Sequence, residues 1–182
     1  MTGYVTDAQG TRWTLPNLMA WRLDYTAGVP CDSFWLRCTW DEENTTHPGD
    51  WVRFEAFHEG EQVFCGVVDE CEVALSQQGR MLEVSGRGMA ALLLDNEALG
   101  QDYICATQAD ILRDHVTVYG IKTAPGASLP AVSQFSVATG SSEWSVVYEF
   151  ARYYGGVAPR FDRLGRLVLT GWSDSQERLV GD

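Results

Sequence analysis

A chain of 182 residues with 45% hydrophobic and 12% aromatic residues can bury a core, which excludes wholesale disorder. Its formal net charge of −12 excludes a reader of nucleic-acid sequence and a ligand of anionic membranes, because both need a basic surface. Residues 1–100 carry a net charge of −10, so the acidity belongs to the first half. This charge favours solubility, or a surface past which DNA slides without sticking.

The sequence predicts no export signal and no metal centre. The segment 1–7 has no basic region and no apolar core, and no apolar run is long enough to span a bilayer. The cysteines are odd in number and form no CxxC pair, which argues against a disulfide framework and a zinc site; they are Cys31, Cys38, Cys65, Cys71 and Cys105. We therefore expect synthesis in a reducing cytoplasm and no membrane association.

Alternating apolar and polar residues predict antiparallel strands in the first half, at 19–26, 34–40, 51–58, 63–75 and 81–85. We expect Val52, Phe54 and Ala56 to share one face of the third strand. The apolar face of the fourth strand is expected to hold Val63, Cys65, Val67, Cys71, Val73 and Leu75. Asp69 interrupts that face, which predicts a bend or bulge. Hairpin connections and long strands then suggest a small closed or nearly closed barrel.

Helical patterns begin near residue 88. Good helix formers occupy 89–94, and Thr107, with Asp110 three residues on, is expected to cap a second helix that ends at Gly120. A short strand at 135–137 precedes a third helix, capped by Ser141 or Ser142 and ended by the glycines at 155–156. A hairpin joins 157–162 to 166–170. The predicted class is α+β: an antiparallel barrel domain at 1–100, then a small α+β domain at 101–182 with helices near 107–119 and 142–154 and a C-terminal hairpin.

Three patterns could carry chemistry, and each has a simpler structural explanation. The segment 86–91 reads G-x-G-x-x-A, but no buried parallel strands accompany it, so we interpret it as a tight strand-to-helix corner. Cys65 could pair with His58 as nucleophile and base, although an apolar strand face silences a thiol. Glu70 and Glu72 share one face of a strand. They could act as the paired carboxylates of a glycosidase, or they could simply be solvated surface residues.

Aromatic and arginine side chains on polar strand faces are better candidates, as interface residues. Trp35 lies on the polar face of its strand beside Arg37, and Phe57 lies opposite the apolar face of its strand, with Arg53. Arg87, at the strand-to-helix corner, completes the set of five. Exposed tryptophans could alternatively stack on sugar rings.

Two ordered sets of segments carry a resemblance to a known family. The first runs from Phe64–Asp69 (FCGVVD) across a hairpin to Leu82–Asn96 (LEVSGRGMAALLLDN). The second runs from Phe135–Trp144 (FSVATGSSEW) to a hairpin around Asp162–Leu167 (DRLGRL). Over about residues 50–172 the chain resembles the N-terminal portion of the baseplate hub proteins of contractile-tailed phages and phage-tail-like particles, the late-control D or tail hub family.

The resemblance implies a tube-like β barrel, inserted α/β elements and, past the position of Asp182, a second barrel. It implies that Gly66, Gly86 and Arg87 define the barrel corner. Three copies in this family close a ring that continues the tail tube and carries the spike, and the family has no catalytic residues and no cofactor.

We therefore expect a non-enzymatic structural component of a phage tail or tail-like baseplate hub, made in the bacterial cytoplasm. Its expected partners are other copies of itself in a trimeric ring, the spike and tube proteins, and DNA that crosses the lumen without specific binding. A carbohydrate-binding module and a cell-wall hydrolase remain alternatives. The sequence leaves open whether the source is a phage, a bacteriocin or a secretion machine.

Overall fold

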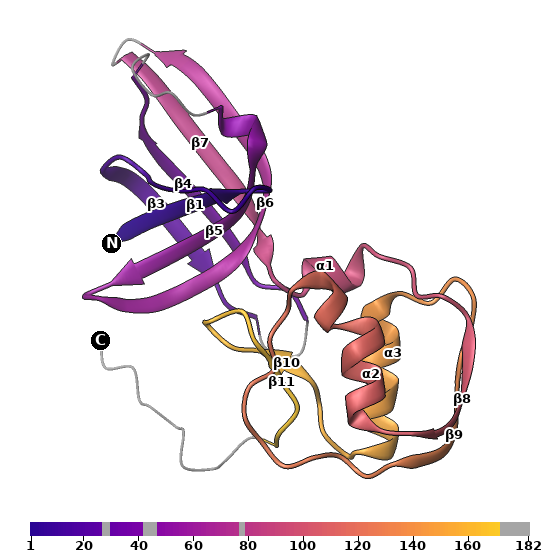
Figure 1. Ribbon diagram of the computed structural model, residues 1–182. Helices are drawn as coiled ribbons and strands as arrows, with labels where there is room; N and C mark the ends of the chain where they lie inside the picture. The colour runs from indigo at the N-terminus through magenta and orange to yellow at the C-terminus, as the bar shows by residue number, and fades with distance from the viewer. Residues whose placement is uncertain (27–29, 42–46, 77–78, 172–182) are drawn as a thin grey trace.

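The computed structural model describes residues 1–26, 30–41, 47–76 and 79–171, which form two parts (Figure 1). One part is a strongly twisted antiparallel sheet. The other contains the helices and two small two-stranded sheets, and it lies against one end of the large sheet.

The large sheet has seven strands in the order β2-β1-β5-β6-β7-β4-β3, and every neighbouring pair is antiparallel. The strands are β1 (Thr2–Asp7), β2 (Arg12–Thr14), β3 (Leu18–Asp24), β4 (Ser33–Thr39), β5 (Trp51–His58), β6 (Glu61–Ser76) and β7 (Gly79–Gly88). A short 3-10 turn, η1 (Pro48–Asp50), leads into β5. The sequence pattern missed β1 and β2, and β7 is longer than expected.

The prediction of a closed barrel is wrong, because the sheet ends in two edge strands, β2 and β3, that do not pair with each other. The backbone supplies a reason. β2 is only three residues long, and Pro16, which follows it, has no N–H to extend a ladder. The sheet instead curls around a single core of inward-facing residues, namely Val5, Leu15, Phe34, Leu36, Cys38, Trp40, Trp51, Phe54, Ala56, Phe64, Leu82 and Val84.

Bulges decide which side chains reach this core. The register of β6 against β7 shifts between Val68 and Glu70, which confirms the bulge expected at Asp69. The predicted apolar face is only partly right: Cys71, beyond the bulge, packs against this core, whereas Val73 and Leu75 project into solvent, Leu75 with 83% of its surface exposed. Val52 is exposed as well, because the register of β5 against β1 steps from Trp51 to Arg53 and leaves it as the extra residue.

Two glycines let β6 and β7 approach the aromatic centre of the core. Gly66 lies directly opposite Phe54, and Gly86 directly opposite Phe34. The two rings stack with centroids 4.3 Å apart. A side chain at Gly86 would meet the Phe34 ring, and one at Gly66 would meet the Phe64 ring. A Cβ on Gly86 would lie 2.0 Å from the Val67 carbonyl oxygen, and one on Gly66 would lie 2.2 Å from that of Arg87. Both positions therefore require glycine.

The second part begins with the one-turn helix α1 (Ala91–Leu94). It continues with β8 (Gln101–Ala106), α2 (Gln108–His115), the 3-10 turn η2 (Thr117–Tyr119), β9 (Val132–Val137), α3 (Glu143–Glu149), the π-helical turn η3 (Phe150–Tyr154), β10 (Arg160–Phe161) and β11 (Leu167–Val168). β8 pairs with β9 and β10 with β11, both antiparallel. The sequence pattern missed β8, and the C-terminal hairpin is shorter than expected.

Local signals in this part are confirmed. Thr107 and Asp110 form a reciprocal capping box at the start of α2. Ser142, rather than Ser141, caps α3 by accepting a hydrogen bond from the Ser145 N–H. Gly120 has a φ of +70°, which ends the turn after α2.

A second hydrophobic cluster lies between the helices and the small sheets. Its largest fully buried members are Met89, Leu93, Val116, Val147, Phe150 and Leu167. The same cluster includes Cys65 of β6, with Val67 packed against it, so the large sheet is one wall of this core. The division into domains at residue 100 stays a prediction.

Candidate interaction surfaces

The outer face of β4 and β7 carries an aromatic–arginine–carboxylate cluster. Arg37 Nε donates to Glu83 Oε1 at 2.7 Å, and the indole N–H of Trp35 donates to Glu83 Oε2 at 3.2 Å. The Arg37 guanidinium also lies 5.3 Å from the Trp35 ring centroid. The hydrogen bond from Arg37 lowers the pKa of Glu83 below its ordinary value. These contacts fix two of the candidate residues, Trp35 and Arg37, side by side on the outer face.

A second cluster of the same composition lies on β1, β2 and β5. The guanidinium of Arg12 stacks 3.9 Å from the Tyr4 ring centroid and 5.6 Å from that of Phe57, and it forms an ion pair with Glu55 at 2.8 Å. Tyr4 and Phe57 meet edge to face. Arg12 was not among the sequence candidates, because β2 shows no clear alternation and β5, which supplies Phe57 and Glu55, is distant in sequence.

The remaining two candidates, Arg53 and Arg87, lie where the second part covers the sheet. Both are register partners of Val67, on either side of it, and Val67 packs against the second hydrophobic cluster. Arg53 Nη2 lies 3.7 Å from the sulfur of Met89. These two side chains therefore belong to a contact within the chain, and they lie apart from the Phe57 cluster.

Arg87 is held by two carboxylates. Its guanidinium donates to both oxygens of Asp69, at 2.8 and 2.9 Å, and to both oxygens of Asp95, at 3.0 and 2.7 Å. Asp69 is the bulge residue of β6, and Asp95 follows α1. One side chain of β7 thus ties the bulge to the first helix, and its hydrogen bond lowers the pKa of Asp95.

The patterns with catalytic potential are not assembled. Cys65 lies opposite Glu55, whereas His58 lies opposite Glu61, so thiol and imidazole are separated by three positions, or about 10 Å, along the ladder. Burial raises the pKa of the Cys65 thiol to about 11, which disfavours a nucleophilic thiolate.

Glu70 and Glu72 are solvent-exposed. The helix after Gly86–Ala91 has only four residues, and β7 is antiparallel to both neighbours, so a dinucleotide unit is lacking there. The described residues contain no cluster of side chains suited to hold a metal ion.

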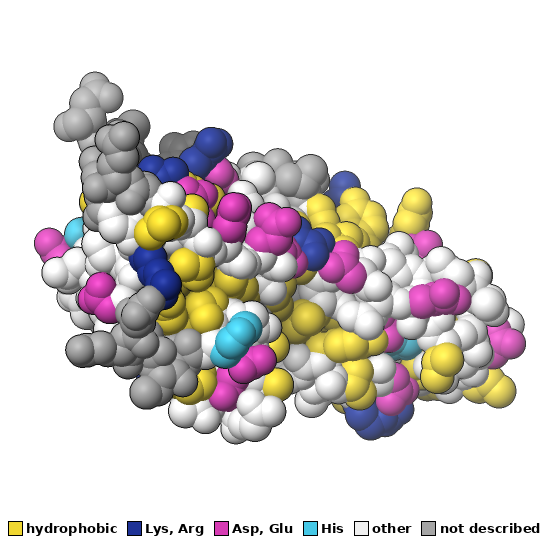
Figure 2. Space-filling view, turned by 90° about the horizontal axis from the view of Figure 1, so that it is seen from above, with side chains coloured by type: hydrophobic (Ala, Val, Ile, Leu, Met, Phe, Trp, Pro, Cys, Tyr) yellow, Lys and Arg dark blue, Asp and Glu magenta, His cyan; other side chains and the backbone are white. Residues whose placement is uncertain are grey.

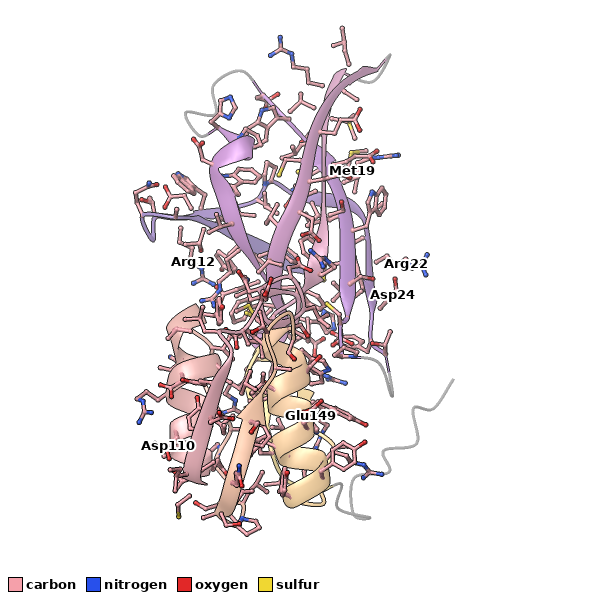
Figure 3. The ribbon with its side chains drawn as sticks, turned by 90° about the vertical axis from the view of Figure 1, so that its right-hand side faces the viewer. Arg12, Met19, Arg22, Asp24, Asp110 and Glu149 are labelled. Atoms are coloured by element: carbon pink, nitrogen blue, oxygen red, sulfur yellow. The ribbon has the colours of Figure 1, made fainter. Side chains whose placement is uncertain are left out.

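The clearest apolar surface is the free edge strand β3. Three large side chains expose about half of their surfaces here: Met19 and Trp21 of β3, and Tyr25, which follows the strand. The exposed fraction of Trp21 is 52%. Their alternation predicted a buried face, but β3 pairs on one side only, and Trp21, opposite the buried Leu36, lies at the unclosed rim of the core. Figure 3 labels Met19, Arg22 and Asp24 projecting from this edge. Trp40 and Trp51, by contrast, fill the core and meet edge to face.

A buried polar network in the second part escaped the sequence analysis. His115 of α2 is 2% exposed, and its Nδ1 lies 2.6 Å from Oε2 of Glu143, which is also buried. Tyr119 donates to the other oxygen of Glu143 at 3.0 Å, and the Tyr103 hydroxyl lies 2.9 Å from His115 Nε2. The network joins β8, α2, η2 and α3. It lies in the packed core of this part, and pairs 28 residues apart leave no mark in the local pattern.

Neither a protein-family model nor a curated protein matches this sequence. Solved structures do match its fold. A 43 kDa tail protein of prophage MuSo2 from Shewanella oneidensis superposes with a TM-score of 0.69 at 17% identity, over 92% of this chain and 53% of its own. This chain has the fold of a phage tail protein.

Two further structures agree with the phage tail fold. The tail protein from Neisseria meningitidis MC58 gives a TM-score of 0.64 at 21% identity, over 91% of this chain and 50% of its own. An Escherichia coli protein gives 0.50 at 16% identity, over 92% of this chain and 44% of its own. That protein is described as a component of the type VI secretion system that resembles the bacteriophage T4 tail proteins gp27 and gp5. The present chain thus spans about half the length of the tail proteins it matches. None of its described helices is long and apolar enough to cross a membrane.

Proposed function

We propose that the chain is a structural, non-enzymatic component of a phage tail or tail-like baseplate hub that assembles with copies of itself into a trimeric ring between tail tube and spike. The observation that carries this proposal is the match of both parts of the chain, 92% of its length, to the prophage tail protein. The type VI secretion protein that matches extends the same fold to tail-like machines. The protein would then be located in the virion tail or in a tail-like particle.

The unclosed sheet suits ring assembly. An edge strand presents unpaired backbone groups that pair readily with another chain, and β3 adds three exposed apolar side chains to that edge. A contact between two different edges is heterologous, and such contacts form a ring when the rotation from one copy to the next closes. On the outer face, Trp35, Arg37 and Phe57 supply the aromatic and arginine side chains that are enriched at interfaces.

The charge suits a DNA channel. Acidic side chains outnumber basic ones over both parts of the face seen in Figure 2, and residues 1–100 carry a net charge of −10. A negative lumen lets a phosphate backbone pass without capture. The neighbouring spike and tube proteins would complete the ring above and below.

Purified tails or tail-like particles from the source organism test the role. We expect mass spectrometry to detect the chain and electron microscopy to place it at the junction of tube and spike. Its absence from intact particles would contradict the proposal.

The edge contact has its own test. Trp21→Glu is expected to lower incorporation of the tagged chain into particles by tenfold or more, because it places a charge on the apolar edge. Val118→Glu, at an exposed apolar position of η2, is the matched control and should incorporate normally. Equal incorporation of both variants would rule out β3 as the contact.

A further inference from the structure

A groove lies where the large sheet meets the second part. Its volume is about 920 Å³. One wall comes from the segments after β3 and before β4, with Tyr25 and Asp32. The opposite wall comes from α3 and the β10–β11 hairpin, which lies below the end of the sheet in Figure 1. Junctions of this kind are favoured places for binding sites.

Aromatic side chains line the groove and leave it open. Trp144 and Tyr148 of α3 contact each other, with ring centroids 6.3 Å apart, and Trp144 also lies 6.1 Å from Phe161 of β10. Tyr25 closes the other side, fixed by a hydrogen bond from its hydroxyl to the Val63 carbonyl. Tyr25 and Tyr148 both expose more than a third of their surface. These rings fit an apolar or aromatic side chain that enters from solvent.

The groove is also basic, in a chain with a net charge of −12. Arg160, Arg163 and Arg166 line it, against the two carboxylates Asp32 and Asp162. Asp162 is engaged by Arg166 at 2.7 Å and caps the hairpin turn by accepting from the Leu164 and Arg166 N–H groups. Among the described lining residues, arginines therefore outnumber carboxylates by three to two.

Arg163 stands at the rim of this groove. Its guanidinium lies 5.6 Å from the Tyr25 ring centroid, and among the described residues no carboxylate forms an ion pair with it. A guanidinium stacked on an aromatic ring keeps its donor fork open to a carboxylate, which it binds through two hydrogen bonds.

We propose that this groove binds a short acidic segment of another protein, one of whose carboxylates pairs with Arg163 while an apolar side chain packs among Tyr25, Trp144, Tyr148 and Phe161. Aromatic and arginine side chains are the ones enriched at the energetic centres of protein interfaces. A nucleic acid fits less well, because its dense phosphate charge is repelled by a chain of net charge −12. The groove shares Tyr25 with the end of the β3 edge, but its other lining residues lie away from that edge, and the proposal does not depend on ring assembly.

Fluorescence polarisation tests the proposal with the full chain and a labelled octapeptide that alternates glutamate with phenylalanine. A second octapeptide, with glutamine in place of glutamate, is the neutral probe. We expect the acidic probe to bind at least tenfold more tightly than the neutral one, and to weaken as salt rises from 50 to 500 mM. Arg163→Glu and Tyr148→Ala should each weaken binding tenfold or more. Both side chains are exposed, so neither change threatens the fold.

Arg22→Glu is the matched charge reversal on the free edge strand and should bind like the unaltered chain. Absence of binding, equal affinity for both peptides, or binding that Arg163→Glu leaves intact would overturn the proposal. Tighter binding of a single-stranded oligonucleotide, lost in Arg163→Glu, would reassign the groove to phosphates. Self-association of the chain that Arg163→Glu abolishes would reassign it to a second copy, again against the proposal.

Discussion

At the residue scale, single side chains hold the second part together through a buried network of hydrogen bonds. His115 and Glu143 are both removed from water, and such a pair is stable only while each group keeps its hydrogen bonds. Glu143 satisfies one oxygen through Tyr119 and the other through His115, so that its carboxylate depends on residues of two other elements. Removing the imidazole would strand a carboxylate in an apolar core.

We predict that His115→Ala lowers the free energy of unfolding by about 3–5 kcal/mol, because it leaves Glu143 buried without its partner. Urea denaturation followed by circular dichroism measures the loss. His58→Ala is the control: His58 is exposed at the end of β5 and should change stability by less than about 0.5 kcal/mol. A loss below about 1 kcal/mol for His115→Ala would show that the pair contributes little.

At the element scale, Arg87 joins β6, β7 and the end of α1 through Asp69 and Asp95. Arg87 lowers the pKa of Asp95 below its ordinary value of 3.8. A carboxyl whose pKa is depressed by folding adds stability at pH values above 3.8, and that stability is lost as the pH falls below this value. Even at neutral pH, where it is fully present, the stabilisation by this ion pair is small and falls as salt is added, since Asp95 is largely exposed.

We predict that Arg87→Gln flattens the acid limb of the stability curve. Melting temperatures measured from pH 5 down to pH 2.5 should fall less steeply in the variant than in the unaltered chain, since the variant has less ion-pair stability left to lose. Arg22→Gln, which removes an exposed pair with Asp24 on β3, serves as the control and should keep the original slope. Parallel curves for Arg87→Gln and the unaltered chain would contradict the coupling.

The same scale shows what the sequence could and could not predict. Thr107, Ser142 and the Asp69 bulge were predicted correctly, because caps and bulges depend on a few neighbouring residues. Closure of the sheet was predicted wrongly, because it depends on whether β2 and β3 meet across the molecule. β8 was missed: it is short, and Cys105 breaks its pattern with a φ of +60°.

Among the candidate interface residues, alternation along β4 correctly placed Trp35 and Arg37 together on the polar face. It could not show that Arg53 contacts Met89 and that Arg87 is held by Asp69 and Asp95, because these contacts depend on how the chain folds back after β7. Nothing in the sequence indicated the groove beside Arg163, because residues far apart in sequence form it. Its two walls come from segments more than a hundred residues apart.

At the scale of the whole molecule, the two parts share structure across their junction. The second hydrophobic cluster uses Cys65 of β6, and Met89, just after β7, packs fully buried within it. Arg53 reaches the sulfur of Met89 from β5. A division of the chain at residue 100 would therefore cut through the second core, since Cys65, Met89 and Leu93 belong to it and precede that residue. We expect the sheet and the helices to unfold together.

We predict that Met89→Ala destabilises both parts equally, by about 2–5 kcal/mol, because truncation leaves a cavity between them. Hydrogen exchange read by mass spectrometry measures this. Peptides from β7 and from α3 should report free energies of opening equal to each other in the unaltered chain, and both values should fall by the same amount in the variant. Met19→Ala, at an exposed position of the edge strand, should change neither. If α3 lost its protection while β7 kept its own, the two parts would be independent folding units that merely touch at Met89.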